Sequence, residues 1–259
     1  MKMNTLKYYK KYSSLLMMGL MITMASACAK DDDPGPEPPL EPGKVEFYKL
    51  QRVENLDAET DDNNPTVPKK AVYFSLEDKQ EVSLNMAKTH RWDLGLSGLY
   101  NSFVSGNNGD NAANFGAGGP GKGGVMIVEK PFAEVVNIPA DSEFKTGVGV
   151  IGTDNMGDFG EGTGWYIYDF GGGIIGDASY EKSHVAYALG SPIKLKNGNT
   201  APARTLIIRT SRGNYAKIKM ISCYKDAFSP ELWFRNTPHM YFSFEYVMAP
   251  KGSSKFEVR

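Results

Sequence analysis

The chain has few of the residues on which enzymatic chemistry and disulfide scaffolds depend. It contains two cysteines and three histidines in 259 residues. Two cysteines cannot form the framework of a disulfide-rich secreted domain, and three histidines leave few candidates for a histidine general acid or base. A serine in a glycine elbow, a phosphate-cradling loop and paired zinc-ligand spacings are also missing from the sequence. We therefore expect a protein that is not an enzyme.

A surplus of basic residues is also missing. The whole chain has a net charge of −1. Residues 1–27 hold four lysines and no acidic residue, so the rest has 25 basic and 30 acidic residues and a net charge near −5. Phosphate binding needs a basic surface, so this balance argues against a nucleic acid partner.

Long hydrophobic runs and helical periodicity are lacking as well. The apolar run at 15–24 is shorter than the ~20 residues that a membrane-spanning helix needs. No long stretch repeats its apolar residues with the 3.6-residue period of a helix. The 28 glycines, 14 tyrosines and 13 phenylalanines instead favour β structure. We expect an all-β, mostly antiparallel domain.

Alternating and β-branched segments predict the strands. In 92–96, alternation places Trp92, Leu94 and Leu96 on one face of a half-buried strand. A polar turn containing Gly213 joins 204–210 to 215–221 and predicts a β-hairpin. The glycine-rich segments 105–124 and 171–176 indicate long flexible loops. Strands are predicted at 72–76, 81–84, 92–96, 125–128, 164–169, 204–210, 215–221 and 239–247.

The N-terminal segment is typical of a secretory signal. A lysine-rich start and a short apolar core lead to Ala25-Ser26-Ala27, and Cys28 follows. Ala27-Cys28 resembles the cleavage and lipidation site of bacterial lipoproteins. Acylation of Cys28 would hold the protein at a membrane through its buried methylenes. The alternative is an ordinary signal peptide followed by an incidental cysteine.

An acidic, proline-rich stretch follows the cysteine. Lys30 and the aspartates 31–33 resemble the surface-export signal of Bacteroidetes lipoproteins, and the prolines at 34–42 form a stiff spacer. We thus expect a signal peptide at 1–27, a lipidated cysteine and linker at 28–44, and a single β domain at 45–259. The expected location is the outer membrane, with the domain at the cell surface. If 29–33 is only a solvated linker, the domain faces the periplasm.

Several of these motifs follow one another in a recognisable order. They are the segments 72–76 with 81–82, 92–94, 121–125, 164–166, 208–218 and 241–246. Their order resembles the HmuY family of haem-binding lipoproteins from Bacteroidetes. The resemblance implies an all-β, hand-shaped domain whose β-hairpin fingers clasp a haem, with two axial histidine or methionine ligands. It also implies capture of haem outside the cell and its transfer to an outer-membrane TonB-dependent haem transporter.

The resemblance leaves the ligand assignment open. Counted from Gly164, the family's second ligand position falls on Phe170, which cannot bind iron. His184 follows on a longer loop and is one candidate axial ligand, although it also fits an exposed loop histidine. Met156, among glycines and acids, is the other candidate, or it is partly buried in its loop. His239 opens the final predicted strand, away from these loops.

Further residues could assist a bound porphyrin. Haem propionates need a positive charge, for which Arg91, Lys122 and Lys182 are candidates. An alternative function follows from Phe170: a family-shaped module that has lost iron ligation and binds another porphyrin, a glycan or a partner protein. Tyrosines that could stack on or ligate a porphyrin, or simply pack, are Tyr166, Tyr168, Tyr180 and Tyr187.

Overall fold

The computed structural model describes residues 43–67 and 69–257. The predicted signal peptide at 1–27, Cys28 and nearly all of the linker lie outside the described residues. The short 3-10 helices are η1 Leu84–Met86, η2 Leu99–Asn101, η3 Phe132–Glu134, η4 Asp141–Glu143, η5 Tyr180–Lys182 and η6 Pro230–Leu232. The strands are β1 Gln51–Asp57, β2 Val72–Ser75, β3 Gln80–Val82, β4 Leu94–Ser97, β5 Phe103–Gly106, β6 Gly124–Val128, β7 Tyr166–Asp169, β8 Val185–Ala188, β9 Ile193–Lys194, β10 Thr200–Ala201, β11 Thr205–Arg209, β12 Tyr215–Tyr224 and β13 His239–Ala249.

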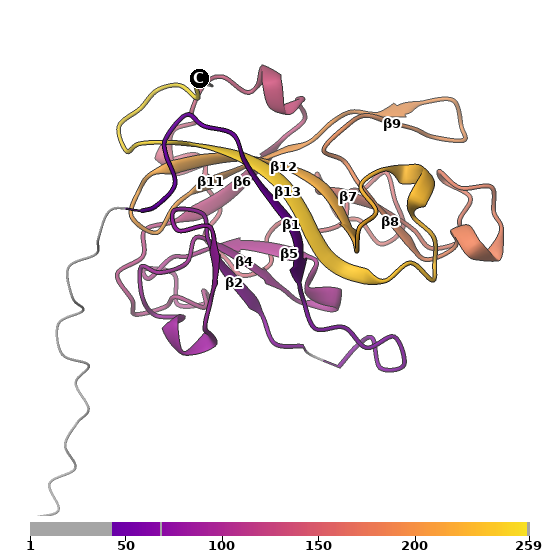
Figure 1. Ribbon diagram of the computed structural model, residues 1–259, viewed down its shortest axis with the longest axis horizontal. Helices are drawn as coiled ribbons and strands as arrows, with labels where there is room; N and C mark the ends of the chain where they lie inside the picture. The colour runs from indigo at the N-terminus through magenta and orange to yellow at the C-terminus, as the bar shows by residue number, and fades with distance from the viewer. Residues whose placement is uncertain (1–42, 68, 258–259) are drawn as a thin grey trace, which may run out of the picture. The chain divides into compact units, whose positions relative to one another are not determined.

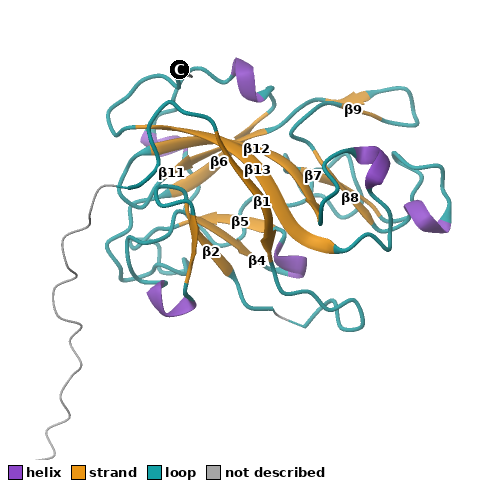
Figure 2. Cartoon of the chain, viewed as in Figure 1, coloured by secondary structure: helices purple, strands orange, loops and turns teal. Residues whose placement is uncertain are grey.

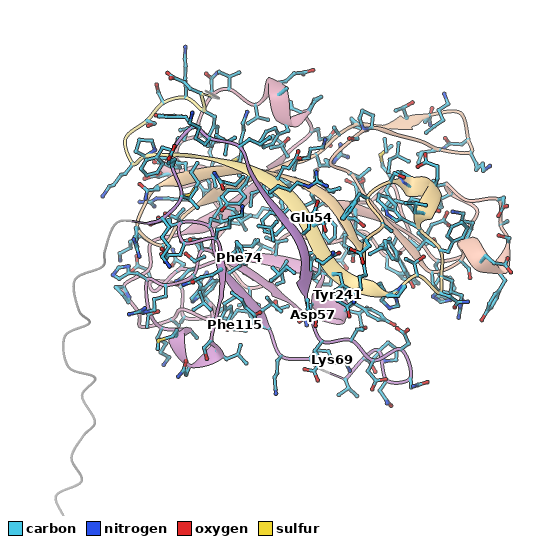
Figure 3. The ribbon with its side chains drawn as sticks, in the orientation of Figure 1. Glu54, Asp57, Lys69, Phe74, Phe115 and Tyr241 are labelled. Carbon is cyan, nitrogen blue, oxygen red and sulfur yellow. The ribbon has the colours of Figure 1, made fainter. Side chains whose placement is uncertain are left out.

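The largest sheet has five antiparallel strands in the order β1-β13-β12-β11-β6. Its long strands run side by side through the centre of the described region (Figure 1). β11 and β12 form the predicted hairpin, with Arg209 opposite Tyr215. Asp57 of β1 pairs with Tyr241 of β13, and both are labelled in Figure 3.

A second, four-stranded sheet, β3-β2-β4-β5, packs against the first. Phe74 of β2 meets Phe244 of β13 edge to face, with ring centroids 5.6 Å apart. The Tyr246 hydroxyl donates a hydrogen bond of 2.9 Å to the carbonyl of Leu76. All these residues belong to the main core, which the inward faces of both sheets fill.

β7 and β8 form a separate two-stranded unit that is fixed to the same core. Trp165, Ile167 and Tyr187 are fully buried in the core. The backbone N–H of Ala186 in β8 donates to the hydroxyl of Tyr224 at the end of β12. Figures 1 and 2 show β7 and β8 beyond the long strands, beside short helical turns. The core therefore fixes this hairpin rigidly while its tip extends outward.

The all-β prediction is confirmed. The described segments are strands, 3-10 turns and loops, and none of the helices they contain is long and apolar enough to cross a membrane. Each predicted strand coincides with an observed strand to within a few residues. Five observed strands had no sequence prediction: β1, β5, β8, β9 and β10.

One predicted face is wrong. Trp92 lies before β4 begins, so it does not follow the alternation of that strand. Its ring stacks on Tyr73 at 4.5 Å in a small cluster with Val82, whereas Leu94 and Leu96 belong to the main core. β4 is consequently buried on both faces instead of one.

The glycine- and asparagine-rich segment 105–124 is tied down by side-chain hydrogen bonds. Asn107 donates to the carbonyls of Thr89 and Trp92, and Asn114 donates to those of Gly106 and Thr146. Both asparagines are buried. Buried amides that bond backbone carbonyls replace the ladder hydrogen bonds that a loop lacks. The loop is therefore a hydrogen-bonded structure instead of the flexible connection that its composition indicates.

Candidate functional site

A group of aromatic rings gathers at the tip of the β7–β8 unit, and we call it the aromatic face. Phe159 is 76% exposed and Phe170 is 47% exposed, values that are high for large apolar side chains. Phe170 lies 5.6 Å from Phe159 and 4.5 Å from the His184 ring, both edge to face. The aromatic face consists of Phe159, Tyr168, Phe170 and His184, which ring contacts join, and of the exposed Tyr180 and Phe234 on the adjoining loops.

His184 is held in a defined orientation within this face. Its Nδ1 lies 2.8 Å from the Tyr168 hydroxyl, and its backbone N–H donates to the carbonyl of Phe170. Its φ of 58° lies in the left-handed region that side chains other than glycine rarely adopt. Within the described part of the chain, Nε2 has no hydrogen-bond partner. A residue held in an unfavourable backbone conformation with one free ring nitrogen is a functional candidate.

The surroundings of His184 favour its neutral form. Burial lowers the pKa of the imidazole, and the nearby positive charge of Arg235 lowers it further. Neutral imidazole is the form that binds metals. When Nδ1–H donates to the Tyr168 oxygen, the lone pair is on Nε2. A metal-bound histidine usually has such a partner on its other nitrogen.

The loop that carries Met156 and Phe159 runs along the other edge of β7. Thr153 in this loop forms an isolated parallel β-bridge with Tyr166, and the N–H of Asp158 donates to the carbonyl of Tyr168. Gly157 makes this close approach possible, because a Cβ there would lie 2.8 Å from the Tyr168 nitrogen. Met156 is partly buried and packs against the main core.

Buried carboxylates fix both loops that flank β7. Asp154 is fully buried and accepts from the N–H groups of Met156 and Gly164 and from the guanidinium of Arg204. Asp169, at the end of β7, accepts from the backbone N–H groups of residues 174, 175 and 176. These bonds replace backbone pairing in the loops and position the aromatic face.

A second pair of loops, distant in sequence, completes the face. The N–H of Arg235 donates to the carbonyl of Glu181, and Nζ of Lys182 donates to the carbonyl of Trp233. Lys182 also lies 3.6 Å above the Phe234 ring. The loops at 180–184 and 230–237 therefore form one surface with two cations beside the rings.

His239 lies closer to this face than its place in the sequence suggests. It pairs across the sheet with Tyr224, whose hydroxyl bonds to β8, so the prediction that it lies away from the ligand loops is wrong. Its Nε2 lies 2.9 Å from Asp62, and its ring meets Tyr100 at 5.8 Å. Burial, together with Asp62, raises the pKa of Tyr100 to about 12. Tyr100 is thus a neutral phenol at physiological pH.

The two predicted ligands lie on segments that flank β7 on opposite edges. His184 belongs to the exposed aromatic face, and Met156 lies on the loop that Asp154 holds. Of the predicted cations, Lys182 lies at this face. Lys122 does not, because it bonds Asp110 and pairs with the turn at Ser211, at the other end of the β11–β12 hairpin.

The four tyrosines separate into two roles. Tyr166 and Tyr187 are buried in the main core, and the Tyr166 hydroxyl bonds Ser102 and Thr153, so they pack instead of facing a ligand. Tyr168 and Tyr180 belong to the aromatic face. Sequence reasoning missed Phe159 and Arg235. For Phe159, the only local signal was the position of a phenylalanine among the glycines and acidic residues of 157–162.

No group of three or more His, Cys, Asp and Glu side chains that could hold a bare metal ion was found among the described residues. A surface hollow of about 540 Å³ lies elsewhere, between the start of the domain and the β2–β3 turn. Charged and polar residues dominate its lining, which includes Lys44, Glu46, Lys49, Asp78 and Lys79. It contains no side chain suited to haem iron, so we assign the candidate site to the aromatic face.

Comparison with known proteins places the chain in a family. No curated protein matches it. Among solved structures, the apo HmuY analog of Tannerella forsythia shares 13% identity over 80% of this chain and 100% of its own, with a TM-score of 0.35. A provisionally named lipoprotein of Bacteroides fragilis shares 15% identity over 82% of this chain and 96% of its own, with a TM-score of 0.33.

A provisionally named HmuY-like heme-binding protein of Bacteroides vulgatus shares 11% identity over 80% of this chain and 97% of its own, with a TM-score of 0.31. Likeness at this level does not identify a fold by itself. The model of the HmuY protein family, in contrast, matches residues 68–246, which include the four-stranded sheet, the five-stranded sheet apart from β1 and the end of β13, and the whole aromatic face. The chain belongs to the HmuY family.

Proposed function

We propose that this protein is a haem-binding surface lipoprotein that captures haem and delivers it, unchanged, to an outer-membrane TonB-dependent transporter. The observation that carries the proposal is His184. Its Nδ1 is fixed by Tyr168, its Nε2 has no partner in the described part of the chain, and the exposed ring of Phe170 packs against it. Family membership supports the same ligand.

The residues present fit a haem. Histidine and methionine are common axial ligands of haem iron, and the bound group would supply the iron that they hold. His184 would provide Nε2, while Tyr168 keeps its ring oriented. The exposed rings of Phe159 and Phe170 offer the apolar contact that a flat macrocycle needs. Met156, on the loop that runs along the other edge of β7, is the second proposed ligand and would provide its thioether sulfur.

Titration with haemin tests this function. Wild-type protein should shift the Soret band, and His184→Ala should weaken binding by at least about tenfold and change the spectrum, since even a lost supporting residue costs a metal site 10–100-fold. Met156→Leu keeps the volume of the side chain but removes the sulfur, so it tests the second ligand. His90→Gln is the matched control. His90 lies beside Ser211, at the other end of the β11–β12 hairpin, and this variant should bind as wild type does.

Two results would contradict the proposal in different ways. No Soret shift in either the oxidised or the reduced state would reject haem as the ligand. If both His184→Ala and Met156→Leu bind haemin with unchanged spectra, haem remains the ligand, but His184 and Met156 are rejected as the residues that hold its iron.

Phe170 favours a second candidate function. It occupies the family's expected ligand position, is 47% exposed and lies against His184. A module of this shape that has lost iron ligation would bind another porphyrin, a glycan or a partner protein. Equal affinity for haemin and metal-free protoporphyrin would support this alternative, because the iron then contributes nothing to binding.

The anchor is proposed from the N-terminal sequence alone. Acylation at Cys28 would hold the domain at the outer membrane, with the proline-rich linker as a spacer. Cells expressing the full chain and fed a labelled fatty acid should yield labelled protein, and Cys28→Ser should remove the label. Equal labelling of both proteins would contradict lipidation at this residue.

A further inference from the structure

Arg235 differs from the other described arginines whose partners are defined. Arg52, Arg204, Arg209 and Arg212 each pair with a carboxylate. Arg235 forms no ion pair with a carboxylate in residues 43–67 and 69–257. A half-buried guanidinium without an anionic partner is unusual, because its partial desolvation has no compensating charge.

The protein nevertheless holds this side chain firmly in place. Nη1 of Arg235 donates to the Ser183 hydroxyl at 2.9 Å, and the guanidinium lies 4.5 Å from the centre of the Tyr180 ring. Its backbone N–H is bonded to the carbonyl of Glu181. Of the three guanidinium nitrogens, Nη1 donates a hydrogen bond, whereas Nε and Nη2 have no partner among the described residues. A guanidinium presents its N–H groups as a planar fork that matches a carboxylate.

The position of this fork relates it to the aromatic face. Ser183, which it bonds, is the residue before His184, and Tyr180, on which it stacks, belongs to the face. The positive charge of Arg235 also contributes to lowering the pKa of His184. A cation without a carboxylate partner among the described residues therefore lies at the edge of an exposed aromatic surface, close enough to its histidine to influence the imidazole.

The neighbouring cation does not fit this role. Nζ of Lys182 donates to the carbonyl of Trp233 and lies 3.6 Å from the Phe234 ring centre. Burial lowers the pKa of its ammonium group. Lys182 thus joins the two loops, whereas Arg235 keeps free donors.

We propose that Arg235 binds a carboxylate of the ligand that lies on the aromatic face, so that the site selects planar macrocycles with free carboxylates. This inference rests on the proposed haem-binding function and adds a specificity-determining residue to it. Haem meets the requirement through its two propionates, and a neutral ester of the same macrocycle does not.

The test compares haemin with haemin dimethyl ester under identical solvent conditions. Wild-type protein should bind haemin about tenfold more tightly, the effect of one charge-assisted bidentate contact. Arg235→Gln should remove most of this preference, while its affinity for the ester stays close to that of wild type. Arg235→Lys keeps the charge without the fork and should show an intermediate preference. Arg52→Gln, whose partners are Glu54 and Glu245, is the matched control and should retain the full preference.

The outcomes separate the two proposals. Equal binding of haemin and its ester by wild type, or an unchanged preference in Arg235→Gln, would overturn the role of Arg235 and leave haem binding intact. If neither compound binds, both proposals fail. Circular dichroism shows whether Arg235→Gln still folds. If it does not, Arg235→Lys decides the question: a folded Arg235→Lys that prefers haemin over the ester as strongly as wild type does would overturn the bidentate contact.

Discussion

Asp154→Asn should lower the free energy of unfolding by about 3–5 kcal/mol, the cost of leaving a buried charge without its partner. Asp154 is fully buried and Arg204 is 3% exposed. Nε and Nη2 of Arg204 both donate to the same Asp154 oxygen, at 3.1 and 2.9 Å. After the substitution, Arg204 would keep the carbonyl of Pro202, and its only carboxylate partner among the described residues would be the exposed Glu129 at 3.5 Å.

The same variant should weaken ligand binding, because Asp154 organises the Met156 loop. Its carboxylate accepts from the N–H groups of Met156 and Gly164 at 3.0 Å each. Gly160 packs so closely on this residue that an added Cβ would lie 2.0 Å from the Asp154 carbonyl oxygen. An amide at position 154 would turn N–H groups toward existing donors and release part of this loop.

Urea unfolding of the purified domain measures the effect. Glu54→Gln is a suitable control, since it removes one exposed ion pair with Arg52 and should change the unfolding free energy by less than about 1 kcal/mol. Adding Arg204→Met to Asp154→Asn should recover part of the loss, because the unpaired charge is then gone. A loss below about 1 kcal/mol in Asp154→Asn would contradict the role of this ion pair.

The stability of the domain should fall as the pH rises from about 4 to about 7, because of Asp93. Burial, together with the neighbouring Glu77, raises the pKa of this carboxyl to about 7. Between the unfolded value near 3.8 and the folded value, the unfolded chain has lost the proton that the folded chain keeps. Raising the pH in this window therefore favours unfolding, by up to about 1.4 kcal/mol per pH unit.

The geometry around Asp93 accommodates the protonated form. The Ser211 hydroxyl lies 3.1 Å from Asp93 Oδ1 and 2.6 Å from the carbonyl of His90. Its single hydrogen can go to that carbonyl, and a protonated Asp93 can then donate to the Ser211 oxygen. Glu77, in contrast, pairs with Arg212 and accepts from Thr210 and Asn214, which suits a carboxylate.

Urea midpoints at pH 5 and pH 7.5 test this prediction. Asp93→Asn cannot titrate, so its midpoint should change less between the two pH values than that of wild type. The variant should also be less stable at pH 5, because its amide cannot accept from both Leu76 N–H and Ser211 N–H as the carboxyl oxygens do. The same pH dependence in both proteins would assign the effect to other groups.

Local pattern was sufficient to predict most of the main sheet. The β11–β12 hairpin has a polar turn with glycine between two apolar runs, and that signal acts over a few residues. The β1 sequence QRVENLD has no apolar run, so nothing local marks it. It becomes a strand because β13 supplies its hydrogen bonds, with Val53 opposite Phe244.

The candidate site was only partly predictable for a similar reason. His184 could be found because the chain has three histidines, and Tyr168 was among the tyrosines considered. Arg235 could not be found, because its role depends on Ser183, 52 positions earlier in the chain. The asparagines at 107 and 114 show the same limit. The composition of segment 105–124 indicates a flexible loop. The loop is ordered because these asparagines donate hydrogen bonds to backbone carbonyls that are distant in sequence.

The place of β13 in the main sheet bears on when that sheet can form during synthesis. Among the described strands, β1 is an edge strand whose only neighbour is β13, and β13 also pairs with β12 over most of its length. The first strand thus has no partner until residues 239–249 have been made, and contacts so distant in sequence form slowly. A chain that emerges from the ribosome in order therefore cannot complete its largest sheet until its synthesis is nearly finished.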